Sequence, residues 1–208
     1  MDPIIVRLIC LAIGYAIGCL QFAYIIGRFI FKTDIREHGS GNAGASNVLR
    51  TLGKPAGFTV FTLDVLKAMA AFIICALIFG GGGSFFEPGL PLYPGLYGGL
   101  GALLGHCFPF YLKFHGGKGI ASSLGVMLVI DWRAAIAVYL IGALILALTR
   151  YISLTSMIMA LVFPVLLLLF LHMPETFVVA LLMAAMAVFL HRGNIQRLRS
   201  GTERKLVL

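Results

Sequence analysis

Residues 152–171 read ISLTSMIMALVFPVLLLLFL, and none of these 20 side chains carries a charge. A helix rises about 1.5 Å per residue, so a helix of this length is about 30 Å long. That length matches the hydrocarbon core of a lipid bilayer. The run therefore predicts a helix that spans a membrane.

The whole chain of 208 residues has the same character, with 60% hydrophobic and 12% charged residues. A soluble domain has about 45–50% apolar and about 25% charged residues. A water-soluble fold would therefore have to expose much apolar surface, and disorder is excluded because it requires low hydrophobicity. The mean hydropathy of +1.00 supports the same conclusion. The composition predicts an integral membrane protein.

Apolar blocks recur along the chain and predict an all-α fold, a polytopic membrane helix bundle of about seven transmembrane helices in a single domain over residues 1–208. The block 119–131 is short, so it either begins as a half-helix inside the protein or does not span at all. In the second case five spans remain and residues 134–149 are re-entrant. The expected spans are residues 4–27, 55–78, 94–112, 119–131, 134–149, 152–171 and 176–190.

The net charge is +8, from 16 basic and 8 acidic residues. Some gaps between the apolar blocks are rich in basic side chains, and they alternate with gaps that hold little positive charge. The positive-inside rule assigns the basic gaps to the cytoplasm, which puts the N-terminus outside and the C-terminus inside. The basic gaps contain Arg28, Lys32, Arg36, Arg50 and Lys54, then Lys113 and Lys118, then Arg150, and finally Arg192, Arg197, Arg199, Arg204 and Lys205.

Glycine and cysteine residues within the apolar blocks are expected to serve packing. The pairs Gly14/Gly18 and Gly101/Gly105 have the small-xxx-small spacing that lets two helix backbones approach closely. The four cysteines have no C-x-x-C spacing and lie in or beside apolar stretches, which predicts buried thiols. Asp and Glu are scattered singly, so neither a metal nor another cofactor is expected.

The first unusual polar stretch is residues 39–47, GSGNAGASN, followed by Arg50. Its glycines fit the spacing G-x-G-x-x-G. A dinucleotide fingerprint, however, requires a preceding strand in a βαβ unit, and here a membrane helix precedes the stretch. A solvated glycine-rich turn is one interpretation. The functional interpretation is a pocket whose backbone N–H groups and small polar side chains hold an anion.

The second stretch, residues 115–119, reads HGGKG and opens an apolar helix. Glycines permit a nest of N–H groups, a helix N-terminus carries partial positive charge, and Lys118 adds a full charge. This combination suits a phosphate group. It is not a Walker A loop, because Gly119 stands where that motif has the Ser or Thr that binds Mg²⁺. Contact with lipid head groups is the alternative.

The third stretch, residues 191–205, contains His191 and Asn194, which are three positions apart and share a helix face. They are candidates for contact with a substrate, although a basic amphipathic tail is common at inner leaflets. Asp64 and Lys67 lie inside the second span at i, i+3. Two charges at that depth are costly unless they pair or face a polar cavity, so a structural pair near the polar site is predicted.

Together these stretches resemble the bacterial acyl-phosphate:glycerol-3-phosphate acyltransferases, the PlsY family, in order, spacing, chain length and hydropathy over nearly the whole chain. The resemblance implies a membrane enzyme that transfers a fatty acyl group from acyl phosphate to the sn-1 hydroxyl of glycerol 3-phosphate. The products are lysophosphatidic acid and inorganic phosphate, and the reaction is the first committed step of phospholipid synthesis. The similar pieces are Ser40–Asn42 with Ala45–Arg50, Gly105–His106 through Gly116–Gly119, and His191–Ile195 with Arg197–Leu198 and Gly201–Glu203.

The resemblance also implies roles for particular residues. The expected catalytic residues are Ser40, Arg50, His191 and Asn194. The expected substrate-binding residues are Gly41, Asn42, Asn47, His106, Gly116, Gly117, Lys118 and Gly119. The residues expected to be structural are Asp64 and Lys67, from their depth in a span, and Glu203, from the resemblance.

Within this set, Lys118 and Arg50 are predicted to clamp phosphate, while the catalytic side chains orient the hydroxyl and the carbonyl. An acyl phosphate is a mixed anhydride with a good leaving group, so positioning and oxyanion stabilisation suffice without a covalent acyl-enzyme. Which group takes the proton is left open by the sequence, and a phosphate oxygen of the donor is one candidate.

The expected partners are acyl phosphate, glycerol 3-phosphate and membrane lipids, with the enzyme that forms acyl phosphate as a further candidate and no nucleic acid. The expected location is the bacterial cytoplasmic (inner) membrane, as a multi-pass protein with its active site facing the cytoplasm. One alternative is a small lipid or anion transporter, which would explain Asp64 and Lys67 but not polar motifs collected on one side. The other is an acyl-CoA-dependent membrane acyltransferase.

Overall fold

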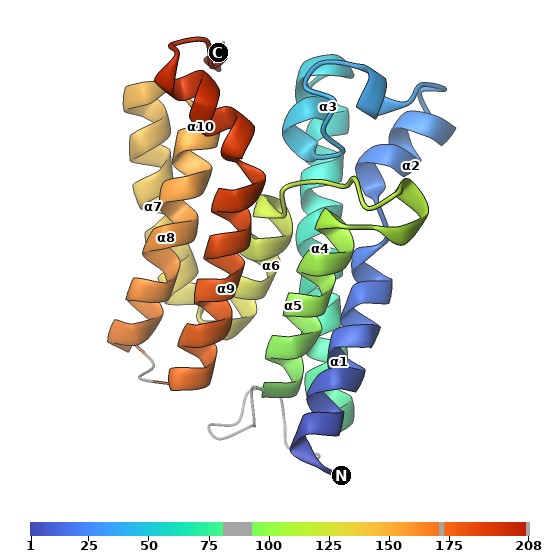
Figure 1. Cartoon of the computed structure of the whole chain (residues 1–208), viewed down its shortest axis with the longest axis vertical. Helices are drawn as coiled ribbons and strands as arrows, with labels where there is room; N and C mark the ends of the chain where they lie inside the picture. Colours follow the sequence, from blue (N-terminus) through green and yellow to red (C-terminus); the bar gives the residue numbers. More distant parts are fainter. Residues whose placement is uncertain (81–92, 171–172, 207–208) are drawn as a thin grey trace. The chain divides into compact units, whose positions relative to one another are not determined.

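The structure is a computed structural model that describes residues 1–80, 93–170 and 173–206, in which every regular element is a helix (Figure 1). This confirms the all-α prediction for the described residues. The chain forms two compact units, residues 1–130 and residues 131–208.

The first unit contains α1 (Pro3–Gly18), α2 (Phe22–Phe29), η1 (Ile35–Glu37), α3 (Ala45–Thr51), α4 (Lys54–Phe79), α5 (Tyr93–Cys107), η2 (Phe110–Leu112) and α6 (Ile120–Ile130), where η marks a short 3₁₀ turn. The second unit contains α7 (Trp132–Thr149), α8 (Ile152–Phe170), α9 (Pro174–Leu190) and α10 (Arg192–Arg199).

Four helical stretches of the described residues are long and apolar enough to cross a membrane. A fifth candidate is the pair α9 and α10, which is bent by 55°. Helices α5 and α6 have 15 and 11 residues, and the expected span 94–112 is helical only as far as Cys107. The four stretches are Pro3–Phe29, Lys54–Phe79, Trp132–Thr149 and Ile152–Phe170.

The single helix expected for the first apolar block is broken at residues 19–21, between α1 and α2. A break inside a membrane span leaves backbone carbonyls that need donors. The Tyr111 hydroxyl donates to the Cys19 carbonyl at 2.7 Å, and the Lys67 ammonium donates to the Leu20 carbonyl at 2.7 Å. Side chains from distant parts of the sequence therefore stabilise the break.

Glycines bring α1 and α5 together, as their spacing predicts. A Cβ atom at Gly14 would overlap the Gly98 carbonyl of α5, and a Cβ at Gly101 would overlap the Leu11 carbonyl of α1. The two backbones are thus in direct contact, and Figure 1 shows α1, α4 and α5 side by side in the first unit. Neither helix tolerates a larger residue at these positions without moving apart. The four cysteines are buried and free, as predicted.

In the second unit, α8 packs against both α7 and α9. The side chain of Asp131 caps α7 by accepting the Arg133 and Ala134 N–H groups at 2.8 and 3.1 Å. Arg150, at φ 61°, turns the chain from α7 into α8. Large apolar side chains remain exposed on helices of both units, which fits a lipid environment better than water. They include Leu8, Leu66, Leu77, Leu140, Leu144, Leu168 and Leu182.

Candidate functional site

The first polar stretch is a loop held in shape by one buried side chain. The Asn47 Oδ1 atom accepts the Ser40 N–H at 2.8 Å. Its Nδ2 atom donates to the carbonyls of Ile35 at 2.9 Å and His38 at 3.0 Å. Asn47 is 2% exposed, and these bonds lie within the loop, so its structural role is to shape the loop. Its role in substrate binding stays a prediction.

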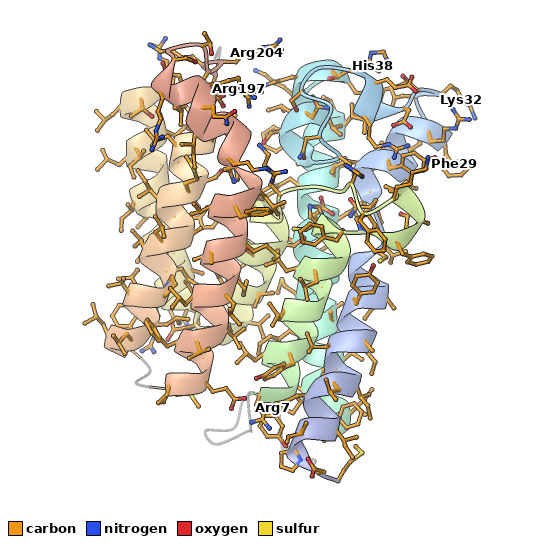
Figure 2. The ribbon with its side chains drawn as sticks, in the orientation of Figure 1. Arg7, Phe29, Lys32, His38, Arg197 and Arg204 are labelled. Atoms are coloured by element: carbon orange, nitrogen blue, oxygen red, sulfur yellow. The ribbon has the colours of Figure 1, made fainter. Side chains whose placement is uncertain are left out.

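Two of the predicted site residues on this loop face outward. Ser40 and Arg50 are both exposed, and Gly39 has a left-handed φ of 60° that positions the Ser40 backbone. Figure 2 shows His38 near one end of the first unit, while Arg7 lies near the other end. The loop thus offers a hydroxyl and a guanidinium at one end of this unit.

A surface ion pair borders the same loop. Arg36 and Asp34 are joined by an ion pair of 2.7 Å, and the Arg36 guanidinium lies over the Tyr24 ring at 5.0 Å. The hydrogen bond from Arg36 holds the pKa of the Asp34 carboxyl below its usual range. Arg36 is therefore committed to local structure, unlike Arg50.

The second polar stretch folds back on the end of α5. The N–H of Gly116 donates to the Cys107 carbonyl at 3.1 Å, and the N–H of Gly117 donates to the His106 carbonyl at 3.0 Å. The sequence predicted that these N–H groups would form an anion nest, and they bind the helix end instead. The reason is that α5 ends at Cys107 and leaves carbonyls without helical partners. The substrate-binding role of the two glycines stays a prediction.

The charged residue of this stretch stands where the chain enters α6. Lys118 is half-buried, and Gly119 follows it with a left-handed φ of 79°. Gly119 also closes against α5, because a Cβ atom there would overlap the Leu103 side chain. A larger residue at position 119 would thus be both strained and crowded, which fixes the direction in which the chain leaves Lys118.

A buried cluster formed by Gln21, Asp64, Lys67 and His106 lies next to this loop. Lys67 Nζ is 2.7 Å from Asp64 Oδ1, and both side chains are 2% exposed. The His106 Nδ1 atom lies 3.0 Å from Lys67 Nζ. The predicted pairing of Asp64 with Lys67 is confirmed. His106 lies between this pair and the second polar stretch, because its ring contacts both Lys67 and Gly117.

Sequence reasoning missed Gln21, which is fully buried in the break between α1 and α2. Its Nε2 atom donates to the His106 carbonyl at 2.5 Å, the same oxygen that accepts the Gly117 N–H. One signal was present in the sequence, because an amide side chain in an otherwise apolar block needs a polar partner.

The third polar stretch begins where α9 ends, in the second unit. His191 is 3% exposed, and its Nδ1 atom lies 2.7 Å from the Ala187 carbonyl. A carbonyl only accepts, so Nδ1 carries the hydrogen and the neutral ring has its lone pair on Nε2. The structure thereby selects one tautomer of His191.

Glu203 organises the residues around Asn194. Its carboxylate accepts hydrogen bonds from Ser153 at 2.6 Å, from Asn194 Nδ2 at 2.7 Å and from Arg197 Nε at 2.7 Å. Partial burial raises the pKa of Glu203, but the three hydrogen bonds outweigh it and hold the pKa below its usual value. Ser153 was not predicted, and its position at the start of α8 gave no signal. Figure 2 shows Arg197 and Arg204 at the same end of the second unit.

A carboxylate has no donor, so the Asn194 amide is oriented unambiguously. Its nitrogen faces Glu203, so its oxygen is the acceptor end of the amide. The two predicted catalytic residues of this unit thus have defined chemical polarity. The structure brings together Asn194 and Glu203 in the second unit, and Asp64, Lys67, His106 and Gly117 in the first.

Known proteins are similar to this chain over almost its full length. The family model described as glycerol-3-phosphate acyltransferase matches residues 8–201. A glycerol-3-phosphate acyltransferase of Thermoanaerobacter pseudethanolicus is 41% identical over 194 residues, covering 93% of this chain and 92% of the relative. One from Shouchella clausii is 40% identical over 197 residues, covering 93% and 92%.

Solved structures agree. The crystal structure of PlsY (YgiH), an integral membrane glycerol 3-phosphate acyltransferase, in its glycerol 3-phosphate form has a TM-score of 0.85 and 32% identity, covering 97% of this chain and 96% of that one. The lysophosphatidic acid form has a TM-score of 0.83 and 31% identity, covering 97% and 95%. The chain therefore belongs to the glycerol-3-phosphate acyltransferase family of integral membrane proteins.

Proposed function

We propose that this protein transfers a fatty acyl group from an acyl phosphate to the sn-1 hydroxyl of glycerol 3-phosphate. The products are lysophosphatidic acid and inorganic phosphate. The family membership supports the acceptor, since the related PlsY is described with glycerol 3-phosphate and with lysophosphatidic acid. The acyl-phosphate donor rests on the resemblance of the three polar stretches to the acyl-phosphate-dependent acyltransferases.

The observation that carries the proposal is the polarity of His191 and Asn194. The Nδ1–H of His191 is directed at a backbone carbonyl and the amide nitrogen of Asn194 at Glu203. The other end of each side chain is an acceptor, His191 Nε2 and Asn194 Oδ1. Acceptors suit a hydroxyl and repel a phosphate, so these residues match the alcohol of glycerol 3-phosphate.

The reaction balances with these groups. The sn-1 oxygen forms a bond to the acyl carbonyl carbon, and the bond from that carbon to the phosphate oxygen breaks. His191 Nε2 takes the hydroxyl proton during attack and passes it to the departing phosphate, which leaves as hydrogen phosphate. An imidazole nitrogen can both accept and release a proton, which suits such a transfer. Asn194 Oδ1 orients the same hydroxyl.

Basic residues of the predicted site supply the positive charge that the two phosphates need. Lys118 binds the phosphate of glycerol 3-phosphate, and Arg50 with the exposed Ser40 hydroxyl binds the phosphate of the donor. Gly41 and Asn42 complete the loop around Ser40. A guanidinium grips a phosphate with two parallel bonds, which fixes the donor's orientation.

The protein acts, in this proposal, as one domain in the bacterial inner membrane, with about seven spans, an outer N-terminus and a cytoplasmic C-terminus. The clustering of basic residues in alternate gaps supports this orientation. A cysteine at position 204, Arg204→Cys, reports it directly. A membrane-impermeant maleimide labels it in inverted vesicles and leaves it unlabelled in spheroplasts, whereas the reverse pattern refutes the orientation.

A donor comparison tests the reaction. Purified protein is incubated with labelled glycerol 3-phosphate and either palmitoyl phosphate or palmitoyl-CoA, and lysophosphatidic acid is measured. We expect product, with one inorganic phosphate released per ester, from palmitoyl phosphate alone. Product from palmitoyl-CoA alone would refute the proposed donor, and no product from either would refute the reaction.

The phosphate role of Lys118 has its own test. Lys118→Ala removes the ammonium and raises the KM for glycerol 3-phosphate, whereas Lys118→Arg retains the charge and recovers part of the loss. A hydrogen bond to a charged group contributes about 1.5–3 kcal/mol, which corresponds to roughly 10- to 150-fold in KM. Kinetics of Lys118→Ala equal to those of the parent would contradict the assignment.

A further inference from the structure

His106 is in direct contact with both glycines of the second polar stretch. A Cβ atom at Gly117 would overlap the His106 Nε2 atom, and a Cβ at Gly116 would overlap the His106 backbone oxygen. That oxygen also accepts the Gly117 N–H at 3.0 Å. Contact with one residue therefore explains why both positions hold glycine, and it leaves no room for a ligand between Gly117 and the imidazole.

The imidazole is in turn held by a buried charge pair. The Lys67 ammonium lies 2.7 Å from Asp64 Oδ1 and 3.0 Å from His106 Nδ1. Its third neighbour is the Leu20 carbonyl, at 2.7 Å. The ammonium is thus surrounded by one ion-pair partner, Asp64, and two hydrogen-bond partners, the Leu20 carbonyl and the His106 ring. The position of the ring is thus fixed both from α4 and from the break between α1 and α2.

The bonding also sets the charge of this group. The Lys67 ammonium is closer to His106 Nδ1, at 3.0 Å, than Asp64 Oδ1 is, at 3.4 Å. Because an ammonium only donates, we take Nδ1 as an acceptor, with the hydrogen of the neutral ring on Nε2, facing Gly117. Lys67 and Asp64 offset each other, so the group as a whole is neutral. A buried group without net charge does not compete with Lys118 for phosphate. This arrangement fits a support for the loop better than a ligand for the substrate.

We propose that Asp64, Lys67 and His106 are positioning residues, which hold the imidazole as a fixed surface against Gly117 and thereby set where the Lys118 ammonium stands. The inference deepens the proposed function, because it takes Lys118 as the residue that binds glycerol 3-phosphate. It changes the role of His106 from substrate ligand to support.

A double-mutant cycle of His106→Asn and Gly117→Ala tests the contact. The Asn side chain keeps an acceptor for Lys67 near the former Nδ1 position and removes the part of the ring that meets Gly117. Gly117→Ala adds the methyl group that overlaps the ring. In the double variant this methyl group enters the space that the ring has left.

We expect each single variant to raise the KM for glycerol 3-phosphate roughly tenfold or more, the size of one misplaced hydrogen bond to a charged group. The kcat and the KM for palmitoyl phosphate change less than about threefold. In the double variant the KM falls roughly tenfold below the product of the two single effects, within the coupling range of contacting residues. Multiplicative effects, or equal losses in kcat and in both KM values, would overturn the proposal.

The parent protein provides a second measurement that does not depend on any variant folding. Histidine ¹⁵N shifts in micelles distinguish the two tautomers, and the His106 ring signals are assigned in the parent protein by through-bond correlation with the backbone signals of His106. We expect the Nε2–H tautomer for His106, and the Nδ1–H tautomer or an imidazolium would overturn the cluster. A parent that makes no lysophosphatidic acid would refute the proposed function, whereas an active parent with multiplicative losses would refute only the positioning role.

Discussion

Replacing Glu203 in two ways measures how much its carboxylate contributes. Three donors converge on it, from Ser153, Asn194 and Arg197, at 2.6–2.7 Å. Glu203→Ala removes all acceptors. Glu203→Gln keeps one oxygen of nearly the same position and replaces the other by an amide nitrogen. The two variants therefore separate the presence of an acceptor from its charge.

The burial of the three donors indicates that losing the acceptor costs more than losing its charge. In Glu203→Ala the Ser153 hydroxyl and the Asn194 amide, 6% and 8% exposed, lose their partner. An unsatisfied buried polar group costs about 1–3 kcal/mol, so the two together cost about 2–6 kcal/mol. Arg197 is 46% exposed and turns to water, so its loss adds about 0–1 kcal/mol. Glu203→Gln keeps both buried bonds without the charge and costs about 1–2 kcal/mol.

Unfolding in mixed micelles, followed by helical circular dichroism during titration with dodecyl sulfate, gives the stability of each variant. The kcat with palmitoyl phosphate reports the orientation of Asn194, and we expect Glu203→Ala to lose more of both than Glu203→Gln. The control is Arg204→Gln, a charge change on the neighbouring exposed side chain, with an expected effect within about 0.5 kcal/mol. If Glu203→Ala were as stable and active as Glu203→Gln, the acceptor would not be what orients the amide.

Three further outcomes follow from the same contacts. Folding lowers the pKa of Glu203, so the ionised carboxylate stabilises the folded protein above the unfolded pKa of about 4.3. This stabilisation is lost as the pH falls through the folded pKa. The rate of acid inactivation therefore rises less steeply with falling pH in Glu203→Gln than in the parent. His191→Asn keeps a donor near the δ1 position and removes Nε2. We expect kcat to fall at least about a hundredfold, while the thermal half-life stays close to that of the parent. An unchanged kcat would exclude His191 as the base. Gly101→Ala places a methyl group against a backbone carbonyl and lowers the unfolding free energy by about 1–3 kcal/mol. The control Leu144→Ala, on an exposed face, lowers it by much less. Equal effects would contradict the close contact between the helices.

The helical membrane fold was predictable because its signals are averages over long segments. Hydropathy identifies a run such as residues 152–171 regardless of its neighbours, and a four-residue glycine spacing is a property of one helix face. The close approach of a helix backbone at Gly14 agrees with that spacing, and the structure identifies Gly98 as its neighbour. No knowledge of distant residues was required for either prediction.

The break at residues 19–21 was not predictable from the same averages. Its carbonyls are satisfied by Tyr111 and Lys67, which are distant in the sequence. A window of hydropathy contains no information about such donors, and it reads the block as one helix. The same limit applies to Gly117, because the direction of its N–H depends on where α5 ends.

Two asparagines show why the candidate site was only partly readable from its motifs. Asn47 and Asn194 both lie in polar stretches of the family pattern, and both are buried. Asn47 uses its oxygen and its nitrogen on the backbone of its own loop, so it acts by shaping that loop. Asn194 directs its nitrogen at a carboxylate, which fixes its oxygen as the acceptor end of the amide.

The distinction between the two asparagines comes from what the nitrogen faces, a backbone carbonyl in one case and Glu203 in the other. A carbonyl partner ties a side chain to the fold, whereas a carboxylate on a separate segment orients it without using its acceptor end. His106 and His191 differ in a related way. The two ring nitrogens of His106 face Lys67 and Gly117, whereas the Nδ1 atom of His191 lies against the Ala187 carbonyl, which makes Nε2 the acceptor of its neutral ring. The partners of both polar ends of a side chain, rather than its residue type alone, are therefore our guide to which residues support the site and which take part in the proposed reaction.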